Sequence, residues 1–364
     1  MAHRTHDALV MVAPRAPYEI CKFDTVAPKD DEVLINVKWT ASTPLDLHQA
    51  DGGLLVEHPS RSGSTSVGVV IEVGPDVKHL KVGDAVFGFA HQKPKWKAHQ
   101  EFATAPEWVF GKIPEGFKLE EAATVPENFV TAFNTLWADL RLPTPWPKPA
   151  NYQPPRADDR ILIWGAASSV GQHIIQVLKF YGYRNLVATA SPKHREYLTS
   201  LGATKCFDYR SHAIVDDLLN SCRDGSTSSY PLIVDCIGSQ EGSLEPISKV
   251  ARTGSTVAVM LPVILKHASN EEKPEYSMDA STSAQWAEGV IVRGVRTHFY
   301  WKNPLFKEKL QLDIMPTLLA EGAVKPNRYR IIEGQTLLER ATKALDTLRN
   351  GVSGEKLVWR VSER

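Results

Sequence analysis

Residues 161–171 read Ile-Leu-Ile-Trp-Gly-Ala-Ala-Ser-Ser-Val-Gly, and this stretch decides the fold of the chain. Its first four residues form a short, unbroken apolar run, which is typical of a strand buried on both faces of a parallel sheet. The residues that follow are almost all small, so the backbone can turn sharply there. Residues 169–181 then carry apolar side chains at helical spacing. The stretch therefore predicts the first strand, turn and helix of a βαβ unit.

The small-residue turn suits a bound dinucleotide. A helix N-terminus offers unpaired N–H groups and the positive end of its dipole to a pyrophosphate. The turn departs from the G-x-G-x-x-G pattern, because Ala167 stands at the second glycine position. A tight turn without a ligand would explain Gly165 and Gly171 but not the small residues between them. We therefore expect the cofactor to be bound by Gly165, Ala166, Ser168, Ser169, Val170 and Gly171.

The end of the second strand, predicted at residues 186–190, indicates which dinucleotide binds. An Asp or Glu there would hold the ribose 2′-hydroxyl of NADH, whereas residues 190–195 read Ala-Ser-Pro-Lys-His-Arg. Charge-assisted hydrogen bonds to a 2′-phosphate are worth about 1.5–3 kcal/mol each, so Ser191 and Lys193 favour NADPH. Alternatively, these cations only flank a solvated helix start, although that position is electrostatically unfavourable for them. Ile237 and Leu261, at the ends of two further predicted strands, also belong to the expected cofactor-binding set.

The pattern around this unit predicts an α/β chain with two domains. Strands predicted at residues 232–238 and 256–261 alternate with helices, which indicates a doubly wound parallel sheet. The first third instead contains short strands separated by turns, for example at residues 33–39 and 67–74, which is typical of a β-rich, barrel-like domain. A chain of 364 residues also exceeds the size of one hydrophobic core. We expect residues 142–156, with six prolines, to form an exposed loop, and residues 267–284 a surface excursion.

The composition excludes several classes of function. The formal net charge is zero, so nothing favours a nucleic-acid partner or a charged membrane surface. The sequence shows neither a secretion signal nor an apolar run long enough to span a bilayer, and we expect a cytoplasmic enzyme. The four cysteines are scattered, which favours structural thiols over a disulfide framework or a metal site.

Further motifs carry a resemblance to a known group. Residues 165–171, Ala-Thr-Ala-Ser-Pro at 188–192, Leu201-Gly202-Ala203 and Asp208-Tyr209 stand in the order seen in medium-chain dehydrogenases/reductases. So do Gly74, Gly83-Asp84 and residues 86–88. The resemblance implies a GroES-like catalytic domain at 1–128 and 302–364, a Rossmann NADPH-binding domain at 129–301, and an active site between the two domains.

Finer features resemble one branch of that group, the fungal trans-acting enoyl reductases that serve highly reducing polyketide synthases. These features are Thr43-Pro44-Leu45-Asp46, the proline-rich insert and residues 353–358. The resemblance implies that Thr131 lies near the nicotinamide and that Tyr209 joins Ser191 and Lys193 at the 2′-phosphate. The chain departs from the branch at His48, where these reductases usually carry a lysine, and at Thr43, where they carry an asparagine.

The residues favour reduction of an activated C=C bond without a metal. A catalytic zinc requires three protein ligands, and Ser62-Gly63-Ser64-Thr65 replaces the Gly-His-Glu segment of zinc dehydrogenases. After hydride reaches the β-carbon, hydrogen-bond donors must stabilise the charge on the carbonyl oxygen. His48 is our first candidate for this task or for proton supply, and an ordinary loop histidine is the alternative. Thr131 is the second candidate, and a small helical core residue is its alternative. Asp46 is expected to cap a turn or helix.

Three functions remain open at this stage. The favoured one is an NADPH-dependent enoyl reductase in secondary metabolism that acts on the enoyl thioester of a polyketide chain, with a polyketide synthase as its partner in trans. An NADPH quinone or enone reductase acting on free small molecules is the second, and an NADPH-binding protein without turnover is the third. The chain is expected to be a monomer or a homodimer.

Overall fold

The computed structural model describes residues 4–222, 229–269 and 271–363, and the chain divides into two compact units. Unit 1 comprises residues 1–130, 268–274 and 298–364, and unit 2 comprises residues 131–267 and 275–297. Each unit has its own buried apolar core. Both ends of the chain therefore build unit 1, and its middle builds unit 2. The chain passes between the units within helix α3 (Pro126–Asn134), on either side of the short segment 268–274, and within the short 3₁₀ segment η6 (Thr297–Lys302).

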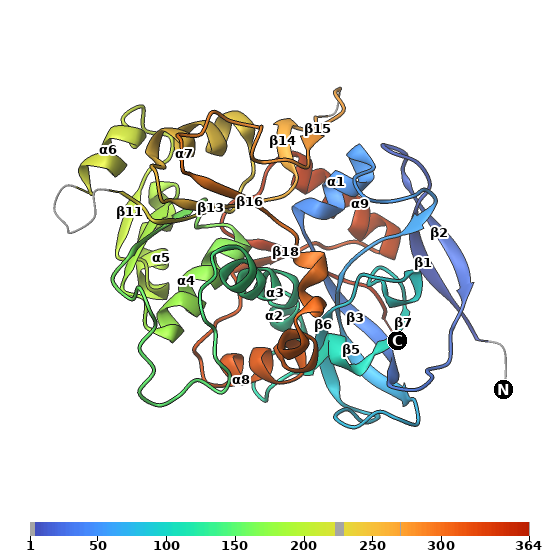
Figure 1. The fold of residues 1–364 in the computed structure, drawn as a ribbon. Helices are drawn as coiled ribbons and strands as arrows, with labels where there is room; N and C mark the ends of the chain where they lie inside the picture. The colour runs from blue at the N-terminus through green and yellow to red at the C-terminus, as the bar shows by residue number, and fades with distance from the viewer. Residues whose placement is uncertain (1–3, 223–228, 270, 364) are drawn as a thin grey trace. The chain divides into compact units, whose positions relative to one another are not determined.

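A six-stranded sheet forms the centre of unit 2 (Figure 1). Its order is β11 (Lys205–Phe207), β10 (Asn185–Thr189), β9 (Arg160–Trp164), β12 (Leu232–Asp235), β13 (Thr256–Met260) and β16 (Ile291–Val295). Every neighbouring pair is parallel. Counted along the chain this order is 3-2-1-4-5-6, that of a doubly wound dinucleotide-binding sheet. The predicted Rossmann fold is therefore confirmed, and the unbroken apolar run at Ile161–Ile163 lies at its buried centre.

Helix α4 (Ser169–Tyr181) follows the first strand of this sheet and lies beside α5 (Arg195–Leu201) (Figure 1). The Oγ of Ser168 caps α4 by accepting the N–H of Gly171 at 3.2 Å. The helix ends at Gly182, whose φ of 98° suits a residue without a side chain. The other elements of unit 2 are η3 (Thr135–Asp139), η4 (Pro192–His194), α6 (Ile214–Asn220), η5 (Gln240–Leu244), α7 (Glu245–Val250), β14 (Val263–Lys266) and β15 (Glu275–Ser277).

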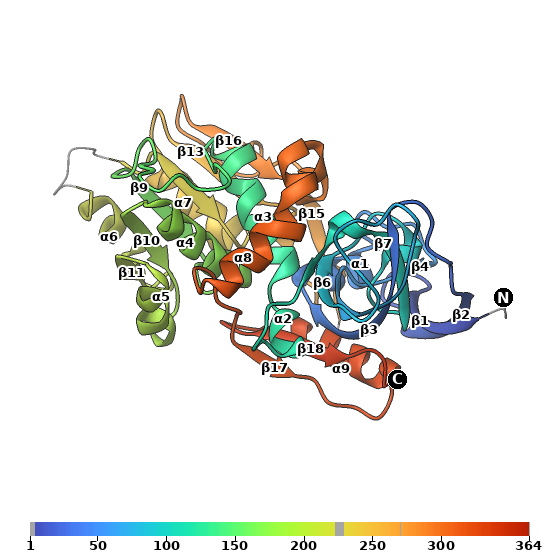
Figure 2. The ribbon, with the colours of Figure 1, turned by 90° about the horizontal axis from the view of Figure 1, so that it is seen from below.

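Two mainly antiparallel sheets form unit 1 (Figure 2). The larger has the order β17 (Tyr329–Ile331), β18 (Lys356–Arg360), β3 (Glu32–Ser42), β5 (Thr65–Val73), β6 (Ala85–Phe89) and β8 (Phe110–Lys112), with β7 (Phe102–Pro106) also pairing with β3. The smaller has the order β2 (Tyr18–Asp24), β1 (Thr5–Met11) and β4 (Ser60–Arg61). The helical segments are α1 (Pro44–Gly52), η1 (Pro94–Trp96), η2 (Glu107–Val109), α2 (Leu119–Ala122), η7 (Phe306–Ile314), α8 (Met315–Ala320) and α9 (Leu337–Arg349). The β-rich domain predicted from the first third of the sequence is thus present.

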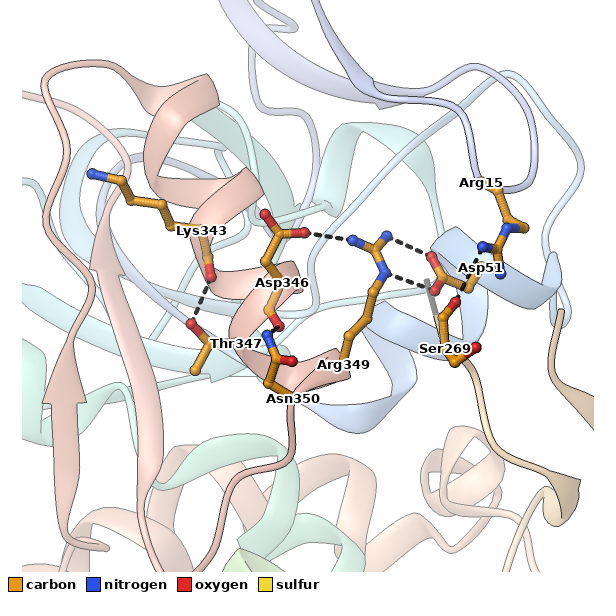
Figure 3. A network of polar contacts seen from close by, with 8 residues as sticks. All are labelled: Arg15, Asp51, Ser269, Lys343, Asp346, Thr347, Arg349 and Asn350. Atoms are coloured by element: carbon orange, nitrogen blue, oxygen red, sulfur yellow. Dashed lines mark hydrogen bonds and ion pairs between the residues drawn. The ribbon is translucent and has the colours of Figure 1, made fainter. Parts of the chain in front are cut away.

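An ion-pair fork fixes helix α1 to helix α9 (Figure 3). The Nε and Nη2 atoms of Arg349 donate to the two carboxylate oxygens of Asp51 at 2.8 and 2.7 Å. Its Nη1 donates to Asp346 at 2.6 Å within α9. The side chain of Asp51 is only 1% exposed, and Arg349 pairs with it in this buried position. The fork therefore sets the position of α1, which carries several residues of the candidate site.

The proline-rich stretch is a loop, as predicted, but it is not exposed along its whole length. Leu142 is 2% exposed, and the carbonyl of Pro145 accepts a hydrogen bond from the hydroxyl of Tyr181 at 3.3 Å. Lys148 donates to the carbonyl of Phe180 at 2.6 Å. The expectation of an exposed loop is corrected because a segment without regular structure can still pack by side chains and carbonyl groups against the end of α4.

Two further segments have local structure that the sequence did not indicate. The excursion predicted at residues 267–284 contains β15, which pairs antiparallel with β14. Residues 306–320 divide into the π-helical segment η7 and the helix α8. Pro316 lies at the start of α8. A proline cannot donate a backbone hydrogen bond, which is a physical reason for a change of helix type close to it.

Candidate functional site

The predicted cofactor residues of unit 2 lie at the carboxyl ends of neighbouring parallel strands. Gly165 follows β9, and Ser191 and Tyr209 follow β10 and β11. Ile237 and Leu261 follow β12 and β13. The strand order reverses between β9 and β12, and doubly wound sheets bind ligands outside their carboxyl ends at such a point. The fold therefore gathers the predicted residues along one edge, and their contacts with a cofactor stay a prediction.

The turn after β9 is tightly packed on its inner side. Gly165 has a φ of 71°, and a Cβ there would lie 2.4 Å from the side chain of Ile237. A Cβ on Gly171 would lie 2.7 Å from the Cα of Ala166. The hydroxyl of Thr189 on β10 accepts the N–H of Gly165 at 3.1 Å. These contacts hold the turn against the start of a thirteen-residue helix, an arrangement that fits a pyrophosphate.

Basic groups stand at the ends of the next two strands. Ser191 is 7% exposed and begins the turn that contains the exposed Lys193. Tyr209 is 41% exposed, and the guanidinium of Arg210 lies 5.9 Å from its ring centroid. The carboxylate of Asp208 is an acid at this edge, and it accepts hydrogen bonds from the backbone N–H and Nε of Arg210 at 3.1 and 3.2 Å. Residues 190–195 themselves contain no acid.

Asp235 supports the same edge and was not identified from the sequence. It is fully buried at the end of β12. Its carboxylate accepts the N–H groups of Ile237 and Gly238 at 2.9 and 3.2 Å and the hydroxyl of Ser243 at 2.7 Å. Burial raises the pKa of Asp235 to about 6, and these donors oppose that rise. The carboxylate thus shapes the turn that presents Ile237.

The two predicted catalytic residues belong to different units. His48 is half-buried on α1 of unit 1. Thr131 is 9% exposed at the first position of unit 2, and its carbonyl accepts the hydroxyl of Thr135 at 2.7 Å. Asp46 accepts the backbone N–H of Thr43 at 2.8 Å at the start of α1, which confirms its predicted capping role. The catalytic roles of His48 and Thr131 stay predictions.

Unit 1 contains a cavity of about 1040 Å³. Its wall is formed by Val10, Val12, Cys21, Phe23, Leu45, Gln49, Leu55, Val56, Glu57, Pro59, Ser60, Arg61, His91, Gln92, Pro94, Lys97 and His298. Helix α1 contributes Leu45 and Gln49, one helical turn apart, whereas His48 is not among the described residues that line it. About half of the residues in the wall are apolar and suit a hydrocarbon chain, and the polar residues among them can orient it.

The sequence analysis identified none of the polar residues of this wall, among them His91, Lys97 and His298. The imidazole rings of His91 and His298 lie 4.7 Å apart and nearly perpendicular, although the residues are far apart in the chain. Burial lowers the pKa of both histidines, so both are neutral near pH 7. No periodic pattern in the sequence links the two segments, so only the fold could bring them together.

Two other kinds of site are absent from the described part of the chain. Within residues 4–222, 229–269 and 271–363, no group of three or more His, Cys, Asp or Glu side chains is arranged to hold a metal ion. No helix in those ranges has the length and apolar character required to cross a bilayer.

Known proteins show clear similarity to this chain. The family model of the alcohol dehydrogenase GroES-like domain matches residues 29–135. A trans-enoyl reductase of Aspergillus japonicus is 30% identical over 91% of this chain and 90% of its own length. The enoyl reductase component of the lovastatin nonaketide synthase of Aspergillus terreus is 26% identical over 91% of this chain and 89% of its own. The solved CurK enoyl reductase superposes with a TM-score of 0.71 and 18% identity, covering 97% of this chain and 99% of that one.

Proposed function

The chain belongs to the trans-enoyl reductases of the medium-chain dehydrogenase/reductase superfamily, and from that premise we propose that it reduces the C=C bond of a polyketide enoyl thioester with NADPH and without a metal. The observation that carries this proposal is the carboxyl edge of the unit 2 sheet. There a capped helix follows a small-residue turn, and the adjacent strand ends in basic residues instead of an acid. The cavity of unit 1 supports an acyl substrate.

The residues at this edge fit NADPH in particular. The turn at Gly165–Gly171 would receive the pyrophosphate, and Ser191, Lys193 and Tyr209 would hold the 2′-phosphate. The exposed ammonium of Lys193 and the half-exposed Tyr209 can both reach an anion in solvent. Ile237 and Leu261 would contact the rest of the dinucleotide. The bound cofactor supplies the hydride, and the protein positions and polarises the substrate.

The protein's task in this reaction is electrostatic. Charge develops on the thioester oxygen when the β-carbon is reduced, and donors placed there lower the barrier. We assign this task to His48 or Thr131, which carry a ring N–H and a hydroxyl. The Ser62-Gly63-Ser64-Thr65 segment offers no imidazole or thiolate for zinc, and the reduction of an activated C=C bond does not require a Lewis acid.

The test is a comparison of substrates and cofactors. We expect NADPH oxidation with a crotonyl thioester at a kcat/KM well above that for a free quinone, and tighter binding of NADPH than of NADH. Equal or faster turnover of the quinone would support the alternative reductase. Tight NADPH binding with no turnover of either substrate would support the cofactor-binding protein. Tighter binding of NADH would overturn the assignment of Ser191 and Lys193.

The proposal includes a partner and a location. We propose that a polyketide synthase presents the acyl chain in trans, and that the chain acts in the cytoplasm as a monomer or a homodimer. Mixing the protein with a reducing synthase that lacks an active enoyl reductase domain tests the first point. Restored reduction in the product supports the partner, and an unchanged unsaturated product overturns it.

A further inference from the structure

One lysine of the unit 1 cavity differs from its neighbours in the chain. The loop after β6 carries Lys93, Lys95 and Lys97. Lys95 forms an ion pair with Glu32, and the exposed Lys93 lies with its Nζ 5.7 Å from the ring centroid of Trp96. Of these three lysines, the cavity wall contains only Lys97. In the described part of the chain, no hydrogen bond or ion pair within 4.0 Å holds its Nζ.

The backbone fixes Lys97 at the cavity wall. Its N–H donates to the carbonyl of Pro94 at 3.3 Å, which closes the 3₁₀ turn η1. The side-chain amide of Gln100 donates to the carbonyl of Lys97 at 2.7 Å. Gln100 is itself fully buried and accepts a hydrogen bond from Arg61 at 2.8 Å. The main chain is therefore held on both sides, while the ammonium remains available to a ligand in the cavity.

The charges around Lys97 come from several elements. The carboxylates of Asp46 on α1 and Glu127 on α3 favour its protonated form, but burial outweighs them and lowers its pKa. The histidines near it, His91, His298 and His99, all have pKa values lowered by burial, so they are neutral near pH 7. Two other cations lie close by, but both are engaged: Lys356 donates to Asn128, and Arg61 of the same wall donates to Gln100 at 2.8 Å. The setting of Lys97 makes it a better acid than an exposed lysine.

We propose that the ammonium of Lys97 is the general acid of the reduction and protonates the α-carbon of the acyl chain. The assignment rests on the proposed function. When the β-carbon has received hydride, the electron pair of the resulting enolate takes a proton from Nζ. The N–H bond breaks, a C–H bond forms at the α-carbon, and the neutral amine regains its proton from water in the cavity. One hydride and one proton are thus added across the C=C bond.

The proposal predicts a stereochemical consequence. A general acid fixed on one wall of the cavity delivers its proton to one face of the enolate, whereas water reaches either face. A 2-methyl-2-butenoyl thioester yields a product with a stereocentre at the α-carbon, and this substrate is the probe. We expect one enantiomer from the wild type. For Lys97→Met we expect a mixture close to 1:1 and a kcat lowered about 100-fold, because general acid catalysis typically contributes 10²–10⁴.

The pH profile provides an independent readout. The kcat of the wild type is expected to fall as the pH rises through the pKa of Lys97, since the amine can no longer donate a proton. This fall is the alkaline limb of the profile. Asp46, whose pKa burial raises to about 7, titrates on the acid side of the alkaline limb. In Lys97→Met the alkaline limb disappears and the limb from Asp46 remains. In Lys97→Ala, added methylamine should restore turnover in proportion to its protonated form.

Lys93→Met is the matched control, because it removes a lysine of the same loop that does not line the cavity. Its kcat and product stereochemistry should match those of the wild type. The dissociation constant for NADPH, which reports on unit 2, should be unchanged in all variants and verifies folding. Absence of wild-type turnover overturns the proposed function. If the wild type turns over normally and Lys97→Met still gives a single enantiomer and an intact alkaline limb, the assignment of Lys97 is overturned. The proposed function is not affected by that result.

Discussion

Removing Arg349 is expected to release helix α1 from α9. Arg349→Met breaks both hydrogen bonds of the fork and leaves the carboxylate of Asp51 without its partner (Figure 3). That side chain is 1% exposed, so water can reach it only if the contact opens. Breaking a buried ion pair on one side costs about 3–5 kcal/mol. The bond to Asp346 adds little, because that carboxylate is 56% exposed and lies within the same helix.

Amide hydrogen exchange of α1 measures this loss directly. A cost of about 3–5 kcal/mol corresponds to exchange faster by roughly 150-fold to several thousandfold, since about 1.4 kcal/mol is a factor of ten. Leu45 and Gln49 on the same helix line the cavity, so the KM for an enoyl thioester should rise as well. Lys343→Met is the matched control on α9. It removes a surface pair with Glu339, worth about 0.3–0.5 kcal/mol.

A double-mutant cycle identifies the cause. In Arg349→Met combined with Asp51→Asn, the carboxylate is absent, so the loss of the arginine should cost less by about 1–3 kcal/mol. Exchange in α1 that changes as little in Arg349→Met as in Lys343→Met would refute the reasoning. Additive free-energy costs of Arg349→Met and Asp51→Asn would also refute it. The fork would then contribute no coupling between α1 and α9.

Four further substitutions test other parts of the structure. Gly171→Val places a Cβ 2.7 Å from the Cα of Ala166, so α4 must move from the turn, and calorimetric titration should show NADPH binding weakened at least about tenfold. Ser191→Ala and Lys193→Ala should each weaken NADPH binding about 10- to 150-fold, for a lost charge-assisted bond of about 1.5–3 kcal/mol, and leave NADH binding unchanged. Burial lowers the pKa of His99 from 6.5 to about 3. Between pH 6.5 and about pH 3 the histidine is therefore protonated in the unfolded chain but neutral in the folded chain. The free energy of unfolding should accordingly fall as the pH drops through this range. In denaturant titrations, His99→Gln should reduce this acid-induced loss of unfolding free energy by up to about 5 kcal/mol.

The sequence predicted those parts of the molecule that depend on local pattern. Ile161–Ile163 and the small residues after Trp164 predicted the strand, turn and helix that the structure contains. The positions of Ser191 and Ile237 at one edge then followed from topology, because the carboxyl ends of parallel strands meet at the same side of a sheet. The relative positions of residues distant in sequence were therefore predictable wherever a regular rule of topology relates sequence order to position in the fold.

The residues of the unit 1 cavity could not be predicted by such rules. His298 joins His91 through packing of segments more than two hundred residues apart, and neither segment has a periodic signal. The three lysines at 93, 95 and 97 alternate in sequence and would share one face of a strand. The 3₁₀ turn at Pro94–Trp96 breaks that alternation, so they have three different environments. Side-chain burial at such places depends on the whole fold.

The environment of Lys97 also predicts opposite effects on stability and on activity. Its pKa is lowered in the folded chain mainly by burial, so the protonated form costs free energy on folding at neutral pH. Stability of the wild type should accordingly increase as the pH rises through this lowered pKa toward 10.5, the ordinary lysine value. Lys97→Met replaces the ammonium with an apolar chain of similar length, and should raise the free energy of unfolding by about 1 kcal/mol and abolish that pH dependence.

A lysine retained only for structure would give the reverse result, with Lys97→Met less stable than the wild type in urea titrations at pH 7. Lys93→Met is again the control, and its exposed position predicts a change within about 0.5 kcal/mol. Natural sequences break local rules mainly where function requires it, and a half-buried cation without an ion pair breaks one. A variant that gains stability while it loses turnover and α-carbon stereochemistry would mean that Lys97 is retained for proton transfer and not for folding.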